Sequence, residues 1–580
     1  MQPCSGLGDG TMAGGQFNRS RRPDDSAAAT PARCADQPAT FTRDSGRATL
    51  RGSVAMQPLR MTSDMKTLRS YVAGRWHEAD TGFAWLVDPS TEEKVARVSS
   101  AGTDFAAVLE HARGRGGEAL RAMTFAQRGG LLKEMSRVLR EHRDELFEIS
   151  RVNSGTTVAD ASFDIDGGGG AIAWYAGLSR TLGDGAVLSE GDAASLARDG
   201  SFQARHVLVA RPGAAVHINA FNFPAWGFAE KAACALLAGM PVIVKPATAT
   251  AMLAERCVEI IIEAGVLPEG TLQMVCGSTG DLLDRLNAYD VLAFTGSAAT
   301  ARSLRDRPAM ADSNTRFNVE ADSLNAAVLA PGAAVATFDL FLRDVVRETT
   351  QKAGQKCTAV RRIFVPRDRL DAVQDALIAR LADVVTGNPA EPGVTMGPLA
   401  TRAQLDDAIA GMHALGAAAR RVLGSGGRVD GRGSPAGKGF FVEPTLFRAD
   451  DPRAAGPVHE REVFGPVSTL MPYDGSAADA AGLVGLGGGM LVTSVYGDDV
   501  DWIREFIAHG AAFAGRVYIG SAEAAGSAPG SGAVYPQTQH GGPGRAGGGA
   551  ELGGMIGLRL YLERVTIQAA PSIVGVMTAS

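Results

Sequence analysis

The chain has 580 residues, of which 45% are hydrophobic and 21% are charged, and its formal net charge is −6. This composition is typical of a globular protein with more than one domain, and it excludes a collagen-like or largely disordered chain. We find neither a basic stripe nor an apolar run of about 18 residues, so we expect no nucleic acid and no membrane as partners, and a cytoplasmic location.

The cysteines are scattered and form neither a CxxC pair nor a cluster with histidine at metal-ligand spacing. They are Cys4, Cys34, Cys234, Cys257, Cys276 and Cys357. The sequence therefore predicts no metal site and no disulfide framework.

Residues 1–64 are rich in Gly, Ser, Arg, Pro and Ala and have little apolar periodicity. Such a segment cannot bury enough surface to fold alone, so we predict a disordered or dispensable extension. A transit peptide is the alternative, but Asp24, Asp25 and Asp36 disfavour it. The extension would then be translated from upstream of a true start codon at Met61 or Met65.

From residue 65 onward the patterns alternate between strands and helices. We expect a hairpin at 70–79, helices within 104–153, strands at 206–213, 213–221, 241–247, 271–277 and 291–297, and helices at 224–239, 252–265 and 280–289. This βαβ alternation with continuous apolar strands predicts an α/β fold whose parallel sheet is covered on both faces. We assign residues 65–320 to a Rossmann-like NAD(P)-binding domain.

Two further regions follow. Alternation resumes in 321–525, which we interpret as a second α/β domain carrying catalysis. Residues 526–580 are Gly-rich and then strand-like in LRLYLERVTIQ, which favours an oligomerisation arm with an edge strand donated to a partner subunit. We therefore expect a homodimer or a homotetramer.

Cys357 is the one candidate for a reactive thiol. It precedes an apolar strand and is flanked by Lys352, Lys356, Arg361 and Arg362, and a cationic setting lowers the pKa of a thiol from about 8.5. The cysteines of the two α/β regions other than Cys357 lie inside apolar patterns, which is typical of inert core residues.

Signals for a nucleotide site are weaker. No GxGxxG follows a strand, but a strand ends at Gly296 and Ser297 and leads into a helix, whose N-terminus can hold a phosphate. A plain strand-to-helix turn is the alternative. Lys245 ends another apolar strand, at the edge where α/β sheets bind ligands. Without the neighbouring motifs, a surface lysine would be the better explanation.

Taken together, these segments resemble the ordered motif set of the aldehyde dehydrogenase superfamily. The motifs are INAFNFPAWG (218–227), VIVKPA (242–247), FTGS (294–297), NVEADSLN (318–325), GQKC (354–357) and EVFGPV (462–467). The resemblance covers residues 66–568 and implies the aldehyde dehydrogenase fold, with a cofactor domain, a catalytic domain and a β-strand arm.

The resemblance also implies a role for each site residue. Cys357 attacks the aldehyde, the Asn222 amide and the backbone N–H of Cys357 hold the oxyanion, and Glu320 activates the hydrolytic water. The presence of Glu320 favours hydrolysis to an acid over transfer of the acyl group to free CoA.

By the same resemblance, Lys245 and Glu462 bind ribose hydroxyls of the cofactor, and Phe464 packs beside the nicotinamide, with a core role as its alternative. Two departures from the family pattern bear on the cofactor. The second glycine of GSxxxG is replaced by Ala301. Thr248 stands where members that prefer NAD carry a Glu, and a hydroxyl does not repel a 2′-phosphate, so we predict NADP, with NAD as the alternative.

Three longer segments are similar to those of the branch that oxidises semialdehydes of CoA thioesters in aerobic aromatic degradation. They are HINAFNFPAWGFAEKAA, FNVEADSLNAA and HGGPGRAGGGAELGG. We expect a CoA-linked semialdehyde as substrate, first 3,4-dehydroadipyl-CoA semialdehyde. The end of the chain just past the arm favours the stand-alone enzyme of benzoate degradation over one with an added hydratase domain. Three alternatives stay open: a general aldehyde dehydrogenase for small aldehydes, a non-catalytic binding protein on this scaffold, and a thiol redox sensor, which would need a resolving cysteine near Cys357.

Overall fold

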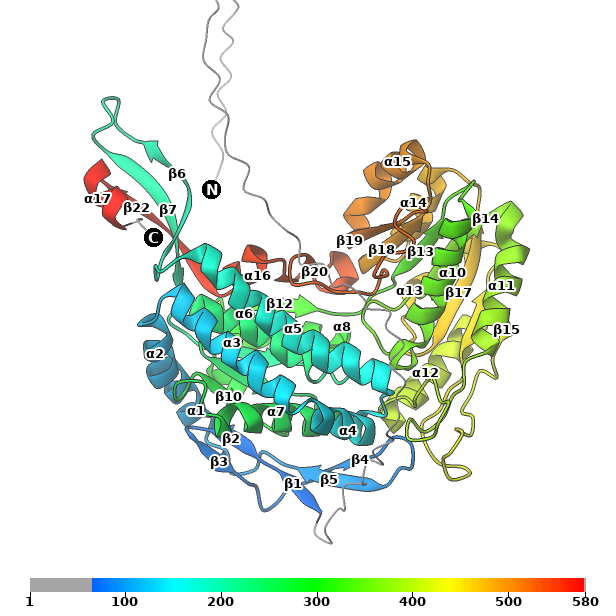
Figure 1. The fold of residues 1–580 in the computed structure, drawn as a ribbon, viewed down its shortest axis with the longest axis horizontal. Helices are drawn as coiled ribbons and strands as arrows, with labels where there is room; N and C mark the ends of the chain where they lie inside the picture. Colours follow the sequence, from blue (N-terminus) through cyan, green and yellow to red (C-terminus); the bar gives the residue numbers. More distant parts are fainter. Residues whose placement is uncertain (1–64, 578–580) are drawn as a thin grey trace, which may run out of the picture. The chain divides into compact units, whose positions relative to one another are not determined.

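The computed structural model describes residues 65–577 (Figure 1). The expected extension of residues 1–64, with Cys4 and Cys34, lies outside the described residues. Across 65–577, no helix is both long enough and apolar enough to cross a membrane.

The first α/β unit is built on a seven-stranded sheet. In spatial order the strands are β12 (Arg316–Glu320), β11 (Val291–Thr295), β8 (Ala215–Ile218), β9 (Val242–Lys245), β10 (Leu272–Met274), β2 (Ser70–Val72) and β3 (Arg75–His77). The strands from β12 to β10 are parallel, while β2 and β3 form an antiparallel hairpin at one edge, as predicted for residues 70–79.

Helices cover both faces of this sheet. Its helical elements are α1 (Phe105–His111), the π-helix η1 (Ala112–Gly116), α2 (Gly117–Arg121), α3 (Phe125–Glu141), α4 (Arg143–Ser154), α5 (Val158–Leu182), α6 (Trp226–Ala238), α7 (Ala251–Glu263), α8 (Ala298–Arg305) and α9 (Pro308–Ala311). Along β9, Val242 and Val244 pack into the core under α3, α5, α6 and α7, whereas Ile243 packs into the core under α1 and α8 (Figure 1). This alternation confirms the α/β fold with a sheet buried on both sides.

One predicted helix is wrong. Residues 280–289 form only the single 3₁₀ turn η3 (Leu282–Arg285), because Leu286 is already extended and the Asp290 carboxylate accepts the Asn287 amide N–H that a longer helix would use. The other short turns of this unit include η2 (Thr248–Thr250).

The second α/β unit repeats the same construction. Its strands, in spatial order, are β15 (Arg420–Leu423), β16 (Thr445–Arg448), β17 (Val467–Tyr473), β14 (Arg362–Pro366), β13 (Ala326–Leu329), β18 (Met490–Tyr496) and β19 (Ala514–Gly520). Its helices are α10 (Val335–Thr350), α11 (Leu370–Ala382), α12 (Arg402–Leu415), α13 (Gly456–Glu460), α14 (Ala477–Gly485) and α15 (Val500–Gly510). All strand pairs except β15–β16 are parallel.

Three smaller sheets complete the described chain. They are β1 (Lys66–Leu68), β5 (Lys94–Val98) and β4 (Ala84–Val87); β6 (Leu188–Ser195), β7 (Gln203–Ala210) and β22 (Leu562–Ala569); and the pair β20 (Gln539–Gly541) and β21 (Ala550–Leu552). The helices α16 (Met555–Arg559) and α17 (Pro571–Met577) flank β22. Strand β22 pairs with β7 of its own chain, and these strands project beyond the helices of the first unit (Figure 1).

The segment predicted as an arm, 526–580, therefore has two parts. Only its last part joins the projecting sheet, and this sheet also includes β6 and β7 from the first unit. Strands β20 and β21 instead lie against β12: the amide of Gly549 donates to Val319 O at 3.0 Å, and the amide of Ala550 donates to Asn318 Oδ1 at 3.0 Å. This part of the C-terminal segment belongs to the interior between the two α/β units.

The turn before Cys357 has an unusual backbone. Lys352, Ala353 and Gly354 have φ values of 54°, 53° and 68°, and left-handed conformations are costly for residues with a Cβ. The Lys352 amide donates to Asp160 Oδ1 at 2.9 Å, which holds this 3₁₀ turn, η4 (Gln351–Gly354), against α5. The turn aims the following residues at the carboxyl edge of the first sheet.

Gly354 also allows a close backbone approach. A Cβ at this position would lie 2.1 Å from the Gly465 carbonyl oxygen, whereas Gly332, with a similar φ of 65°, has open space around it. We expect Gly332→Ala to lower the free energy of unfolding by about 1 kcal/mol from backbone strain alone. Gly354→Ala should cost about 2 kcal/mol more, because the loop must shift as well. Chemical denaturation of both variants measures this difference, and equal losses would contradict it.

Candidate active site

The predicted site residues meet at the carboxyl edge of the first sheet. Asn222 follows β8, Thr295 ends β11 and Glu320 ends β12, and these neighbouring parallel strands deliver their last residues to one place. The loop after η4 brings Cys357 from the second unit to the same edge, where the Asn325 side-chain amide donates to Cys357 O at 2.7 Å. One motif, NVEADSLN, thus contains both Glu320, the candidate base, and Asn325, whose amide holds the loop that carries the thiol.

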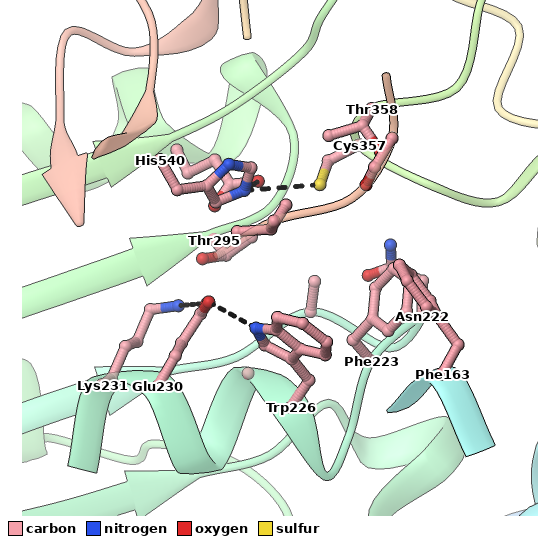
Figure 2. A pocket seen from close by; sticks show the side chains of 15 residues that line it. Phe163, Asn222, Phe223, Trp226, Glu230, Lys231, Thr295, Cys357, Thr358 and His540 are labelled. Carbon is pink, nitrogen blue, oxygen red and sulfur yellow. Dashed lines mark hydrogen bonds and ion pairs between the residues drawn. The ribbon is translucent and has the colours of Figure 1, made fainter. Parts of the chain in front are cut away.

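Cys357 lies at the junction of two cavities. The smaller, of about 50 Å³, is mainly apolar; it is lined by Phe163, Ala220, Asn222, Phe223, Trp226, Gly227, Glu230, Lys231, Thr295, Glu320, Cys357, Thr358, Gly532, Val534 and His540 (Figure 2). The larger, of about 440 Å³, reaches Ala247, Gly296, Ser297, Asp322, Glu462 and Phe464. Cys357, Asn222 and Glu320 line both cavities, so the thiol can be reached from either side.

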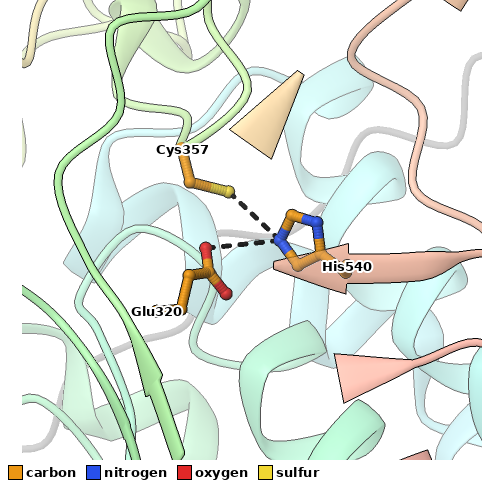
Figure 3. Close-up of side chains that lie close together, drawn as sticks. All are labelled: Glu320, Cys357 and His540. Atoms are coloured by element: carbon orange, nitrogen blue, oxygen red, sulfur yellow. Dashed lines mark hydrogen bonds and ion pairs between the residues drawn. The ribbon is translucent and has the colours of Figure 1, made fainter. Parts of the chain in front are cut away.

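A histidine stands between the thiol and the carboxylate. His540 Nε2 lies 3.6 Å from Cys357 Sγ and 3.2 Å from Glu320 Oε1 (Figure 3). The side chains of Glu320 and His540 are only 4% and 6% exposed, so their charges interact with little screening by water. The three groups form one electrostatic unit.

The three ionisable groups shift one another. Burial opposes ionisation of Glu320, but the His540 imidazole and Lys231 outweigh it and lower the pKa of Glu320. Burial likewise opposes protonation of His540, yet Glu320 and Cys357 raise its pKa well above the ordinary value. Burial and Glu320 raise the pKa of the Cys357 thiol to about 11, against the effect of His540. At neutral pH the unit therefore rests as carboxylate, imidazolium and thiol.

The cationic setting predicted for Cys357 is wrong. Lys356 Nζ donates to Glu348 at 2.5 Å, Arg361 pairs with Glu462, and Arg362 is buried against the carbonyls of other segments. Lys352 Nζ lies 3.6 Å from an Asp164 oxygen and 4.2 Å from the Phe223 ring centre. The irregular backbone turns these four side chains away from the sulfur, and the positive group at the thiol is His540.

Asn222 has the geometry expected of an oxyanion donor. Its Nδ2 donates one hydrogen to Gln355 O at 3.0 Å, which fixes the amide beside the thiol loop. A primary amide carries two N–H donors, so the second remains for a substrate oxygen in the shared wall of the two cavities.

A second buried group of charges lies behind Glu320. Lys231 Nζ is 3.1 Å from Glu230 and 3.0 Å from Glu551, and Trp226 Nε1 donates to Glu230 at 2.8 Å (Figure 2). Glu551 is the cross-strand partner of His540 in the β20–β21 pair, and the Asn318 amide donates to it at 3.1 Å. Burial raises the pKa of Glu551, against the effect of Lys231. The same two strands therefore place an imidazole and a carboxyl group around Glu320.

Lys245 is the last residue of β9, and Thr248 follows Ala247, which lines the larger cavity. The Lys245 ammonium makes no hydrogen bond or ion pair within residues 65–577, and burial lowers its pKa. Thr248 opens η2 and is half-buried, and Ala247 between them lines the cavity. An unpaired ammonium beside a hydroxyl has the donor chemistry that a ribose or its phosphate needs.

Gly296 and Ser297 occupy the turn from β11 to α8. A Cβ on Gly296 would lie 2.5 Å from the Phe294 ring, so this position admits only glycine without a shift. Ser297 caps α8 by accepting from the Thr300 amide at 3.2 Å, and the Asp322 carboxylate accepts from the Ala298 amide at 2.9 Å. Two amides of the first turn, those of Ala298 and Thr300, thus already have side-chain acceptors, which leaves fewer N–H groups for the anion that the sequence predicts here.

Glu462 and Phe464 line the far wall of the larger cavity. Glu462 accepts from the Ser323 amide at 3.0 Å and pairs with Arg361 at 3.3 Å, and burial raises its pKa to about 7 despite Arg361. The half-buried Phe464 ring meets Phe221 edge-on at 5.8 Å. Both side chains border the cavity, so Phe464 is not simply a core residue.

Sequence reasoning missed His540. It is a single histidine in a glycine-rich stretch, at no characteristic spacing from Cys357 or Glu320, and pattern rules read such a stretch as a loop. The available signal was its place at the head of HGGPGRAGGGAELGG, a segment already singled out by resemblance.

The chain resembles known proteins over most of its length. The sequence model of the aldehyde dehydrogenase family matches residues 76–567. A 3,4-dehydroadipyl-CoA semialdehyde dehydrogenase of Aromatoleum evansii is 45% identical over 478 residues, 82% of this chain and 93% of that protein.

Solved structures share the fold. Betaine aldehyde dehydrogenase from Staphylococcus aureus in complex with NAD+ superposes with a TM-score of 0.75 at 24% identity, covering 87% of this chain and 94% of that one. A 3,6-anhydro-L-galactose dehydrogenase in complex with NAP gives a TM-score of 0.76 at 22% identity, covering 87% of this chain and all of that one (100%).

The chain belongs to the aldehyde dehydrogenase family. It is an oxidoreductase that oxidises an aldehyde with a nicotinamide cofactor. A non-catalytic binding protein on this scaffold is thereby set aside.

The cysteines of the described chain should differ sharply in reactivity. Cys234, Cys257 and Cys276 are fully buried, and burial raises the pKa of each thiol, to about 12 for Cys234. Cys357 is half-buried and borders both cavities. We expect iodoacetamide to label Cys357 first in the folded protein. The rate should rise with pH up to about 11, because the thiolate is the reacting form.

Peptide mass spectrometry of samples alkylated at a series of pH values measures this order. Protein unfolded in denaturant, in which all thiols are exposed, is the control. Equal labelling of Cys234 and Cys357 in the folded protein would show that the thiol environments are not as described.

Proposed function

We propose that this aldehyde dehydrogenase oxidises a semialdehyde of an acyl-CoA to the carboxylate, with 3,4-dehydroadipyl-CoA semialdehyde as the first candidate and NADP as the preferred cofactor. The observation that carries the proposal is the 45% identity, over 93% of its length, to an enzyme of that name. The site supports the reaction type, and the relative supports the substrate class and the place in aromatic degradation.

Cys357 is the proposed nucleophile. Its proton passes to the Glu320 carboxylate, the sulfur bonds to the aldehyde carbon, and the carbonyl electron pair moves onto oxygen. The free N–H of Asn222 and the backbone N–H of Cys357 stabilise that oxyanion. Preorganised donors of this kind typically contribute about 10²- to 10³-fold in rate. The cofactor that the walls of the larger cavity would hold would supply a hydride acceptor. The former aldehyde carbon gives up its hydride and becomes the carbonyl carbon of a thioester on Cys357.

Glu320 is the proposed base for hydrolysis. Once its proton has been lost to solvent, the carboxylate takes a proton from water, the hydroxide attacks the thioester carbon, and the thiolate leaves with the C–S electron pair. A carboxylate within the wall of both cavities supports hydrolysis rather than transfer of the acyl group to free CoA.

The proposed cofactor site is the larger cavity, with Gly296, Ser297, Glu462 and Phe464 on its walls. Lys245 lies two residues before Ala247, which also lines this cavity. Thr295 Oγ1 is buried there without a hydrogen-bond partner, as expected of a group that faces a ligand. Preference for NADP rests on the neutral Thr248 and the unpaired Lys245 ammonium, which suit a 2′-phosphate.

The proposed substrate end is the smaller cavity. Its wall includes Phe163, Phe223, Trp226 and Val534, so it suits the methylene chain that follows an aldehyde carbon (Figure 2).

We also propose that the chain forms a homodimer or homotetramer through the sheet β6–β7–β22. Leu196 and Phe202, in the connection between β6 and β7, are 52% and 43% exposed, and Val565 on β22 is 39% exposed. Exposed apolar side chains favour association. Light scattering of the purified chain measures its mass in solution, and a monomer would refute this.

The substrate class is tested by steady-state kinetics. We expect kcat/KM for the CoA-linked semialdehyde to exceed that for hexanal and benzaldehyde by at least about tenfold, since remote binding energy raises kcat/KM. Cys357→Ala should fold normally but lose turnover with every aldehyde. Equal efficiency with the small aldehydes would identify a general aldehyde dehydrogenase instead.

Cofactor preference is tested at Thr248. Thr248→Glu adds a negative charge where a 2′-phosphate would lie, so kcat/KM for NADP should fall by at least about tenfold while that for NAD falls less. Thr248→Ser retains the hydroxyl and serves as the matched control. If Thr248→Glu lowers kcat/KM equally for NADP and for NAD, this residue does not determine the cofactor preference.

A further inference from the structure

His540 is held in place by the fold rather than by the thiol. It is the middle residue of β20, its side chain is 6% exposed, and its strand partner β21 is bonded to β12, which ends in Glu320. The imidazole therefore cannot move far from Glu320 or Cys357 without breaking these strand contacts. Its Nε2 faces both groups at once (Figure 3).

Several elements around His540 contribute charged side chains. Glu320 comes from β12, Glu551 from β21, and Glu230 and Lys231 from α6. Lys231 is engaged by Glu230 and Glu551, and it also lowers the pKa of Glu320. Arg516 on β19 is largely buried, is bonded to Ser531 O at 2.9 Å, and interacts electrostatically with Cys357. Within residues 65–577, His540 is the only cationic side chain that contacts both Cys357 Sγ and Glu320 Oε1.

The proposed chemistry needs such a cation. Cys357 and Glu320 cannot both be negative in a buried site without strong repulsion, and Glu320 is one cause of the raised pKa of the thiol. The proposed function nevertheless requires a thiolate beside this residue. A positive charge shared between the two groups removes the conflict.

We propose that the imidazolium of His540 is the permanent counter-ion of the site: it pairs with the Glu320 carboxylate while Cys357 is a thiol, and with the Cys357 thiolate once the thiol proton has moved to Glu320. The S–H bond breaks, its proton goes to a Glu320 oxygen, and the electron pair stays on sulfur. His540 keeps its proton and redirects the Nε2–H from Oε1 to Sγ. The summed charge of the three groups is zero before and after, so no net charge is created in the buried site.

The inference rests on Cys357 being the nucleophile of the proposed function, but its test needs neither substrate nor cofactor. The measured quantity is the rate of alkylation of Cys357 by iodoacetamide between pH 6 and 11, followed by peptide mass spectrometry. His540→Gln keeps an amide donor but cannot carry the charge. We expect its alkylation rate at pH 8 to fall at least about tenfold, because the thiol pKa rises by at least one unit.

Glu320→Gln should have the opposite effect. Without the carboxylate, the imidazolium pairs with sulfur alone, so Cys357 should be alkylated faster than in the unchanged protein at pH 8. Adding His540→Gln to Glu320→Gln should slow it again. A merely structural role for His540 predicts no such reversal of sign, because loosening the site changes accessibility at every pH.

His217→Gln is the matched control. His217 is a fully buried histidine whose Nε2 lies 3.1 Å from the Tyr561 hydroxyl rather than against the thiol, so its replacement should leave the alkylation profile unchanged. Circular dichroism and thermal unfolding check each variant, and His540→Asn replaces His540→Gln if the latter does not fold.

A pH profile of His540→Gln that superimposes on that of the unchanged protein, or shifts to lower pH, would overturn the counter-ion role. Failure of the proposed function would look different. The variants would then show the expected changes in alkylation rate, but the unchanged protein would not oxidise CoA-linked semialdehydes.

Discussion

The contact between Glu320 and His540 joins two parts of the chain that are far apart in sequence, and the site is organised around it. Glu320 ends a strand of the first sheet, and His540 lies on a short strand that the C-terminal segment lays across that sheet. Both side chains are buried, so each depends on the other to remain charged. Cys357 completes the group only because the strained turn of η4 and the Asn325 amide carry its loop to the same edge.

The surrounding charges follow a consistent order. Moving outward from the thiol, the side chains are imidazole, carboxylate, ammonium and carboxyl, so that neighbours have opposite or reduced charge. Buried ions arranged in this way hold one another in place before any ligand arrives, which is the condition for electrostatic preorganisation. Replacing one of these side chains leaves the charge of its neighbour buried without a partner. Such a replacement destabilises a protein more than replacing both members of the pair.

Local patterns were enough to predict much of this molecule from its sequence. The βαβ repeat gives the sheets, and strand ends carry Asn222, Gly296 and Glu320 because parallel strands deliver their last residues to one edge. Sequence patterns do not predict where side chains point when the backbone is irregular. Lys352 and Lys356 were therefore misjudged as neighbours of the thiol, since the left-handed turn sends them to Asp164 and Glu348 instead. His540 escaped notice because its role depends on a contact between distant segments.

The C-terminal segment serves two regions in immediate succession. Strand β21 ends at Leu552 beside the buried charges, and β22 begins at Leu562 in the projecting sheet, with only the short helix α16 in between. The connection between the two strands, residues 553–561, is therefore short. A displacement of the projecting sheet would therefore act, through residues 553–561, on the strands that hold His540 and Glu551.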